Sequence, residues 1–489
     1  MDQKEYRSHD ATGLAELVAT RQVSAAELLA AARERAAAVN PRINAIVRDV
    51  PATPTDDLTG PFAGVPFLVK DLEQDVAGVP GSGGSRALAD HVATEHSTVV
   101  QRWIDAGLVI FGKTNTPEFG AKGITEPELF GPARNPWDLG RTPGGSSGGA
   151  AAAVAAGIVP CAGASDGGGS IRIPAACCGL VGLKAGRGLV PIGPVAGERM
   201  HGAATNGVVS RTVRDTAAML DVLAGGEPSG PYVPALPDEP FAAAVGQDPG
   251  RLRIGVRVPS AITPDPHPEA RRAVDAAIAA LTAQGHDVVE LAQAPFDDQA
   301  LAKEFLLTWF VSVAASVAEA RRATGAGDEG FERDTLIMAA LGRATSGVEY
   351  VEAVAARHEH ARRLTTFFET HDLLLTPSLA TPPPRIGEFD LPVALARASD
   401  VLLRTRTARL LRHTSVVDDM VEKNLGWVPY TQLANITGRP AISLPLHHTA
   451  DGLPLGVQLV APLGGETLLL RLAAQLEQAV PWADRVAPV

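Results

Sequence analysis

The sequence predicts an α/β fold, and three observations support this. Residues 63–70 form an apolar run that is typical of a strand buried nearly throughout. An alanine-rich helix is expected over 148–156, followed by a short apolar strand within 158–165. Farther along, a strand at 253–256, a helix at 267–284 and a strand at 287–291 predict a β–α–β unit. This rhythm favours a parallel-type sheet.

Other elements are predicted in chain order. Helices are expected over 12–20 and from Ser24, where Ser24 and Glu27 form a capping-box pattern. A first strand is expected at 44–47. The Gly- and Pro-rich stretch 225–249 is interpreted as an exposed insertion. Residues 297–371 are mostly helical by pattern, 372–377 form a buried strand, and 466–477 form a closing amphipathic helix.

Composition indicates a globular protein with a large core. The chain has 489 residues, of which 45 % are hydrophobic and 20 % are charged. Its net charge is −12, and no basic run is longer than two residues. Because a nucleic-acid binder normally presents a basic stripe, no nucleic-acid partner is expected.

Cysteine use and hydropathy indicate a cytoplasmic location. Three cysteines, Cys161, Cys177 and Cys178, cannot form an even disulfide framework, so buried thiols in a reducing compartment are expected. The polar start of the sequence is not typical of a signal peptide. No run of about 18 apolar residues is free of charge, so no membrane span is expected.

The residues most indicative of chemistry are two serines in glycine-rich turns. Ser146 precedes the predicted alanine-rich helix, and Ser170 follows the predicted strand. Glycine allows backbone N–H groups to converge on one point, which suits a developing oxyanion. Lys70 closes a buried strand, where an ammonium is costly unless its pKa falls or it is paired.

These motifs resemble the signature of the amidase signature family, serine hydrolases of carboxamide C–N bonds. The resemblance lies in GGSSGG, in the pattern from Asp166 to Pro174, and in GVPFLVKD, which ends in Lys70 and Asp71. The family separates its two serines by 24 positions, and here 170 − 146 = 24. The resemblance covers residues 10–480 and is weakest over 225–425.

The resemblance implies a catalytic triad of Lys70, Ser146 and Ser170, with no cofactor and no metal. Ser170 would be the nucleophile, and a neutral Lys70 would accept its proton through Ser146. The oxyanion would meet backbone N–H groups around Gly167, Gly168, Gly169 and Ser170.

The implied fold is a central mixed β-sheet covered by helices on both faces, in a single domain over 1–489. Within it, N-terminal helices would occupy 10–50, the catalytic core 60–220, a variable helical pocket segment 297–371, and a C-terminal core 425–480.

The substrate is expected to be a small-molecule amide. The segments KTNTPE, TEPE, RNPW and LGR resemble hydrolases of cyclic nylon oligomers (6-aminohexanoate cyclic dimer), which suggests a secondary or cyclic amide. Aryl acylamides, primary amides, esters and carbamates stay open. A symmetric homodimer is the expected oligomer.

Two positions depart from the family pattern. Ala185 stands where a proline commonly follows the lysine of Gly-Leu-Lys, so the loop there is expected to be more mobile. Gly167 replaces a bulkier residue, so the ordering of the oxyanion site is expected to depend more on its neighbours.

Four alternative interpretations remain open. Residues 107–114 match the GxxxxGK[ST] phosphate loop, although their aliphatic residues favour a strand. Residues 144–148 match the GxSxG elbow of α/β-hydrolases, which would make Ser146 the nucleophile. Lys70 could simply pair with Asp71 or Glu73. Finally, the protein could be the glutamine-hydrolysing component of a tRNA-dependent amidotransferase complex.

Overall fold

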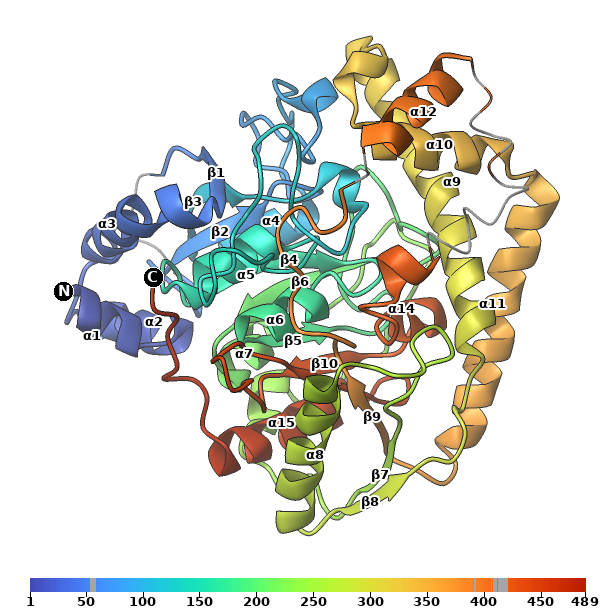
Figure 1. The fold of residues 1–489 in the computed structure, drawn as a ribbon. Coiled ribbons are helices and arrows are strands. Elements are labelled where there is room, and N and C mark those ends of the chain that lie inside the picture. The colour runs from blue at the N-terminus through green and yellow to red at the C-terminus, as the bar shows by residue number, and fades with distance from the viewer. Residues whose placement is uncertain (53–58, 391–392, 406, 408–410, 412–420) are drawn as a thin grey trace.

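A computed structural model describes residues 1–52, 59–390, 393–405, 407, 411 and 421–489. Two sheets form its centre (Figure 1). The smaller has the strand order β1-β3-β2 and the larger has the order β4-β6-β5-β10-β11-β9-β7-β8. The strands are β1 (Ile46–Asp49), β2 (Pro66–Lys70), β3 (Val109–Thr114), β4 (Cys161–Asp166), β5 (Val181–Lys184), β6 (Thr205–Ser210), β7 (Arg253–Val256), β8 (Asp287–Glu290), β9 (Leu373–Pro377), β10 (Ala441–Leu444) and β11 (Val457–Val460).

The larger sheet is mixed. Strands β9, β7 and β8 run parallel, with Ile254 of β7 paired to Val288 of β8, which confirms the predicted β–α–β unit. All other pairs in this sheet, from β4 to β9, are antiparallel. The parallel character indicated by the β–α–β rhythm is therefore confined to one end of the sheet.

The smaller sheet lies beside β4, and the side chain of Gln74 bridges the gap. The backbone N–H of Lys70, at the end of β2, donates to Gln74 Oε1 over 2.7 Å. Gln74 Nε2 in turn donates to the carbonyl of Ala164 in β4 over 3.0 Å. A side-chain amide thus satisfies backbone groups that a direct ladder would otherwise pair. This bridge holds the end of β2 beside β4.

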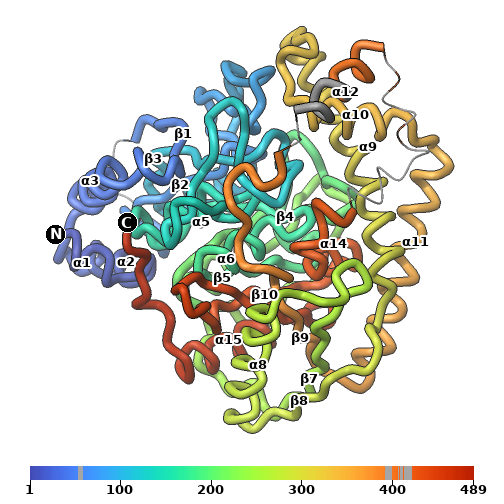
Figure 2. Tube along the Cα trace, in the orientation of Figure 1, coloured from blue at the N-terminus to red at the C-terminus, as the bar shows by residue number. Residues whose placement is uncertain are grey.

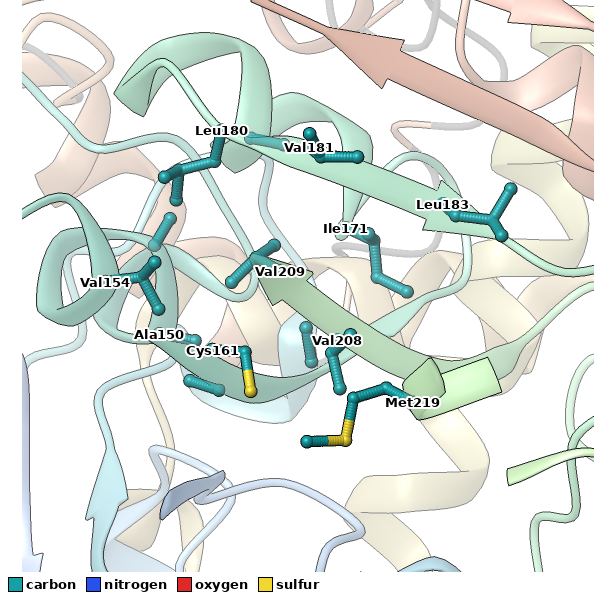
Figure 3. Close-up of a cluster of buried hydrophobic side chains, with 14 of the residues drawn as sticks. Ala150, Val154, Cys161, Ile171, Leu180, Val181, Leu183, Val208, Val209 and Met219 are labelled. Atoms are coloured by element: carbon teal, nitrogen blue, oxygen red, sulfur yellow. The ribbon is translucent and has the colours of Figure 1, made fainter. Parts of the chain in front are cut away.

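Helices cover both faces of the larger sheet. Helices α5 and α6 contact each other and pack on strands β4, β5, β6 and β10, whereas α7 and α15 contact each other and pack on β5, β6 and β10. Figure 3 shows side chains of α5 and α7, including Val154 and Met219, gathered about strands β4 to β6. The helices before residue 290 are α1 (Gln3–Ser8), α2 (Ala11–Ala19), α3 (Ala25–Ile43), α4 (Thr98–Asp105), α5 (Gly148–Ala155), α6 (Arg172–Cys178), α7 (Val213–Leu223) and α8 (Pro268–Ala283). The later helices are α9 (Asp298–Thr324), α10 (Arg333–Ala344), α11 (Gly347–Phe367), α12 (Val393–Arg404), α14 (Gln432–Thr437) and α15 (Glu466–Ala479).

The segment 297–371 is helical, as predicted, and consists chiefly of α9, α10 and α11. These helices stand together at one side of the molecule (Figure 2) and share a hydrophobic core that includes Phe305, Phe310 and Leu364. By length and composition alone α9 could cross a membrane, a test that buried core helices of soluble proteins also pass. In the structure α9 packs against α10 and α11.

Most local predictions are confirmed, with small differences. The Ser24–Glu27 capping box is present at the start of α3. Asn44 ends that helix in a left-handed conformation, so β1 begins two residues later than predicted. The polar N-terminal residues form α1, a helix that the sequence did not lead us to expect. The insertion 225–249 is mostly exposed, but Phe241 is buried.

Candidate active site

Lys70 and Ser146 are in direct contact. Lys70 Nζ lies 2.7 Å from Ser146 Oγ and 3.0 Å from Ser165 Oγ. Strand β2 delivers the lysine, and the turn before α5 delivers Ser146, whose peptide bond with Gly145 is cis. Both residues are buried, at 0 % and 2 % exposure. Ser165 was not singled out in the sequence because a serine inside an apolar strand carries no local signal.

The surroundings of Lys70 favour its neutral form. Burial lowers the pKa of Lys70 to about 7, because desolvation penalises the ammonium, while the charges of Glu73 and Asp166 oppose this shift. Asp71 is occupied elsewhere, since its carboxylate lies 3.1 Å from Lys113 Nζ. Glu73 lies 3.3 Å from the guanidinium of Arg199. The alternative of a salt bridge between Lys70 and Asp71 or Glu73 is therefore wrong.

Ser170 follows a loop that the Asp166 carboxylate organises. Asp166 accepts hydrogen bonds from the backbone N–H of Gly169 over 2.7 Å and of Ile171 over 3.1 Å. The N–H of Gly169 is thereby committed to this carboxylate. None of the described residues accepts a hydrogen bond from the N–H groups of Gly167, Gly168 or Ser170.

A buried ion pair supports this loop from below. Arg172 donates to Asp166 through Nε over 3.0 Å and through Nη2 over 2.9 Å, and both side chains have no exposed surface. The guanidinium of Arg172 holds the pKa of Asp166 well below its usual range, despite the opposing effect of burial. The carboxylate therefore stays ionised and keeps the loop in place.

The C-terminal part of the chain completes the network. Arg172 also donates to the Thr431 carbonyl, to Gln458 Oε1 and to Asn435 Oδ1. Thr431 Oγ1 donates to the carbonyl of Gly168 over 2.7 Å. The sequence placed Thr431 and Asn435 in a stretch that resembles the family but gave them no role, because only folding brings α14 beside Asp166.

Two cavities meet at Ser170. The first, called here the apolar cavity, has a volume of about 400 Å³ and is lined by Ser170 and side chains of α9 and α10 such as Phe305, Trp309 and Met338. The second, called here the polar cavity, has a volume of about 270 Å³ and is lined by both Ser146 and Ser170. Trp309 and Gly120 line both cavities. Ser170 thus faces two different environments.

The structure separates two of the alternative interpretations. Residues 109–114 form β3, whose backbone pairs with β1 and β2, and Lys113 is buried against Asp71, so the phosphate-loop pattern is not a phosphate loop. Residues 142–147 contain no strand, so Ser146 does not stand on the strand-to-helix elbow that an α/β-hydrolase requires.

The loop at Ala185 is closely held. Lys184 Nζ donates to the carbonyls of Ala185 and Arg439, and Gly186 N–H donates to Glu466 Oε1 over 2.8 Å. Burial lowers the pKa of Lys184 to about 7. The expected mobility of this loop stays a prediction.

All three cysteines are buried and free, as predicted, and burial raises the pKa of their thiols. Within the described ranges, no three His, Cys, Asp or Glu side chains form a group that could hold a metal ion.

Comparison with known proteins agrees with this geometry. A family model described as Amidase matches residues 27–470. The chain belongs to the amidase family. The amidase is 38 % identical to the 6-aminohexanoate-cyclic-dimer hydrolase of Pseudomonas sp. (strain NK87) over 97 % of this chain and 96 % of that protein.

Solved structures show the same relationship. A 6-aminohexanoate cyclic dimer hydrolase complexed with substrate superposes with a TM-score of 0.88 and 36 % identity, covering 98 % of each chain. A bacterial aryl acylamidase of the amidase signature family superposes with a TM-score of 0.82 and 25 % identity, covering 98 % of this chain and 97 % of that one. The amidase signature fold predicted from the sequence is confirmed.

The amidotransferase alternative is less well supported. A structure of the glutamyl-tRNA(Gln) amidotransferase from Thermotoga maritima has a lower TM-score of 0.74 at 25 % identity, over 99 % of this chain and 96 % of that one. The comparisons therefore favour a hydrolase that acts on amide C–N bonds.

Proposed function

We propose that this amidase cleaves a secondary amide, cyclic or linear, through an acyl-enzyme on Ser170. The observation that supports this most is the 2.7 Å contact between buried Lys70 and Ser146, beside a cavity that Ser146 and Ser170 share. A secondary amide is favoured by the 38 % identity to a hydrolase named for 6-aminohexanoate cyclic dimer.

The first half of the reaction breaks the C–N bond. Neutral Lys70 accepts the proton of Ser146, and Ser146 accepts that of Ser170 as Ser170 Oγ bonds to the amide carbon. The resulting oxyanion meets the uncommitted N–H groups of Gly167, Gly168 and Ser170. Ser146 then donates a proton to the nitrogen, the C–N bond breaks, and the free amine leaves.

The second half regenerates the enzyme. A water molecule attacks the acyl-enzyme carbon, and its proton passes to Ser146 and Lys70. The bond to Ser170 Oγ breaks, Ser170 recovers its proton through Ser146, and the carboxylic acid departs. No hydrogen bond joins the Ser146 and Ser170 hydroxyls among the described residues, and such contacts often tighten only when substrate is bound.

The two cavities orient the substrate. Because Ser146 donates the proton to the leaving nitrogen and lines only the polar cavity, the amine portion belongs there. The acyl portion, bonded to Ser170, then extends into the apolar cavity between α9 and α10. An aliphatic or aromatic acyl group matches this lining.

Acyl-enzyme trapping tests the proposal. The wild type and its Ser170→Ala and Ser146→Ala variants are mixed with a p-nitrophenyl ester and an anilide of one acyl group, and the intact protein is weighed by mass spectrometry. We expect an acyl adduct on the wild type and none on Ser170→Ala. An adduct that survives in Ser170→Ala but is lost in Ser146→Ala would overturn the assignment of the nucleophile.

Other aspects stay predictions: a homodimer, a cytoplasmic location, and the absence of membrane and nucleic-acid partners. The division of the chain into the segments 10–50, 60–220, 297–371 and 425–480 also stays a prediction.

A further inference from the structure

The polar cavity continues into a third cavity, called here the outer cavity, with a volume of about 420 Å³. The two are contiguous, because they share seven lining residues, and none of the seven lines the apolar cavity. Three of the shared residues are charged: Glu73, Arg199 and Glu319. The amine side of the site therefore has more room than the polar cavity alone provides.

The lining of the polar and outer cavities carries an excess of negative charge. Asp166 is neutralised by Arg172, and Asp71 shares Lys113 with Asp75. Among the described lining residues, the remaining carboxylates are Glu73, Glu95, Glu198 and Glu319, and the one remaining guanidinium is Arg199. Arg199 lies 3.3 Å from Glu73 and 3.7 Å from Glu319. One guanidinium cannot balance four carboxylates.

A second, independent feature of the outer cavity is the hydroxyl of Ser97. Ser97 is only 5 % exposed and lines this cavity, yet its Oγ has no hydrogen-bond partner among the described residues. It occupies the N-cap position of α4 without capping any backbone N–H. A buried hydroxyl without a partner is costly, so a polar group supplied by a ligand would satisfy it.

We propose that the joined polar and outer cavities bind the amine portion of the substrate and select one that carries a second, charged amino group beyond the scissile nitrogen. This inference rests on the proposed function, because it uses Ser146 to place the amine side. The carboxylates compensate the ammonium charge, and Ser97 Oγ accepts one of its N–H bonds. The substrate class is thus an N-(aminoalkyl) amide of an apolar acid.

Three hexanamides that share one acyl group test this selectivity. Their amine portions are 4-aminobutyl, pentyl and 3-carboxypropyl, which are similar in length and differ in charge. We expect kcat/KM for the cationic substrate to exceed that of the neutral one by about fivefold, and the anionic substrate to be the poorest. Free 1,4-diaminobutane should also inhibit competitively and more strongly than pentylamine.

Variants connect the selectivity to the cavity. Glu95→Gln combined with Glu319→Gln should reduce the preference for the cationic over the neutral substrate to nearly one, and Ser97→Ala should reduce it partly. The matched control is Glu369→Gln, which changes an exposed glutamate that lines none of the three cavities and should retain the preference.

The outcomes separate this inference from the proposed function. Equal rates for the three hexanamides, with turnover lost in Ser170→Ala, would overturn the charge selectivity and leave the function intact. A preference for the anionic substrate would also overturn it and point to Arg199 as the binding group. Turnover that survives in Ser170→Ala would contradict the proposed function itself.

Discussion

Lys70 Nζ lies 2.7 Å from Ser146 Oγ, at a place where the lysine side chain has no exposed surface. A lysine can accept a proton from Ser146 only when it is neutral, and burial brings this state within reach at neutral pH by lowering the pKa of Lys70 to about 7. The contact and the desolvation are both needed for a lysine to act as a base.

The pH dependence of activity follows from this pair. Because the neutral form is active and is populated above the pKa, kcat/KM should rise with pH along a limb with its midpoint at about 7. Removing the nearby negative charge in Glu73→Gln disfavours the ammonium further, so this limb should move to lower pH. The measurement is kcat/KM from about pH 5 to about pH 9, and a maximum below about pH 6 would contradict the assigned base.

Ser165 is expected to position Lys70. Its hydroxyl accepts one N–H of the lysine over 3.0 Å, which leaves the lone pair of a neutral amine directed at Ser146. Ser165→Ala should lower kcat by about tenfold, within the usual range of acid–base effects, with little change in KM. Loss of the acceptor also disfavours the ammonium, so the acidic limb should move to lower pH.

A conservative variant provides the control for Ser165. Ser165→Thr keeps the hydroxyl and should restore most of the activity and the pH limb of the wild type. If Ser165→Ala and Ser165→Thr were equally impaired, with an unchanged pH limb, Ser165 would be a packing residue rather than a positioning residue.

The buried pair of Asp166 and Arg172 is expected to contribute strongly to stability. Asp166→Asn leaves the Arg172 guanidinium buried without a counter-ion, which should lower the free energy of unfolding by about 3–5 kcal/mol. Because the pKa of Asp166 is depressed in the folded state, its stabilisation is complete at neutral pH and is lost on acidification. Urea unfolding at neutral pH measures the change.

A second aspartate serves as a comparison. Asp138 accepts from Arg141 over 3.2 Å near the surface, with 41 % of its side chain exposed. Asp138→Asn should therefore cost less than about 1 kcal/mol. Equal losses in the two variants would show that burial does not make the Asp166 pair more costly to break.

Two neighbouring glycines should respond differently to alanine. A Cβ on Gly168 would lie 2.6 Å from Phe305 Cζ, and its backbone conformation tolerates alanine. Gly168→Ala should lose most activity and about 1–3 kcal/mol of stability. Phe305→Leu in the same chain should recover part of both, because it removes the crowding atom.

Gly169 provides the contrasting case. Its φ of +127° lies where L residues are strained, and a Cβ would lie 2.4 Å from Thr431 Oγ1. Gly169→Ala should therefore stay impaired when Phe305→Leu is added. Thermal unfolding and kcat/KM of the four variants measure this, and rescue at both positions would refute the distinction.

Local structure was predictable where the signal is local. The capping box at Ser24, the alanine-rich α5, the buried β2 and the helices of 297–371 follow from propensity and periodicity. The start of β1 was missed because Asn44 takes a left-handed conformation that ends α3. The split between two sheets was missed because it depends on the position of one side chain, that of Gln74.

The sequence by itself determined the α/β class, the family pattern and the identity of Lys70, Ser146 and Ser170, because these are carried by residue types at fixed spacing. The tertiary structure alone decided which groups surround them. Ser165, Thr431 and Asn435 reach the site through strand pairing and helix packing, since contacts between residues 259 positions apart, such as Arg172 and Thr431, leave no local trace. The depressed pKa of Lys70 likewise arises from burial, which only the folded chain creates.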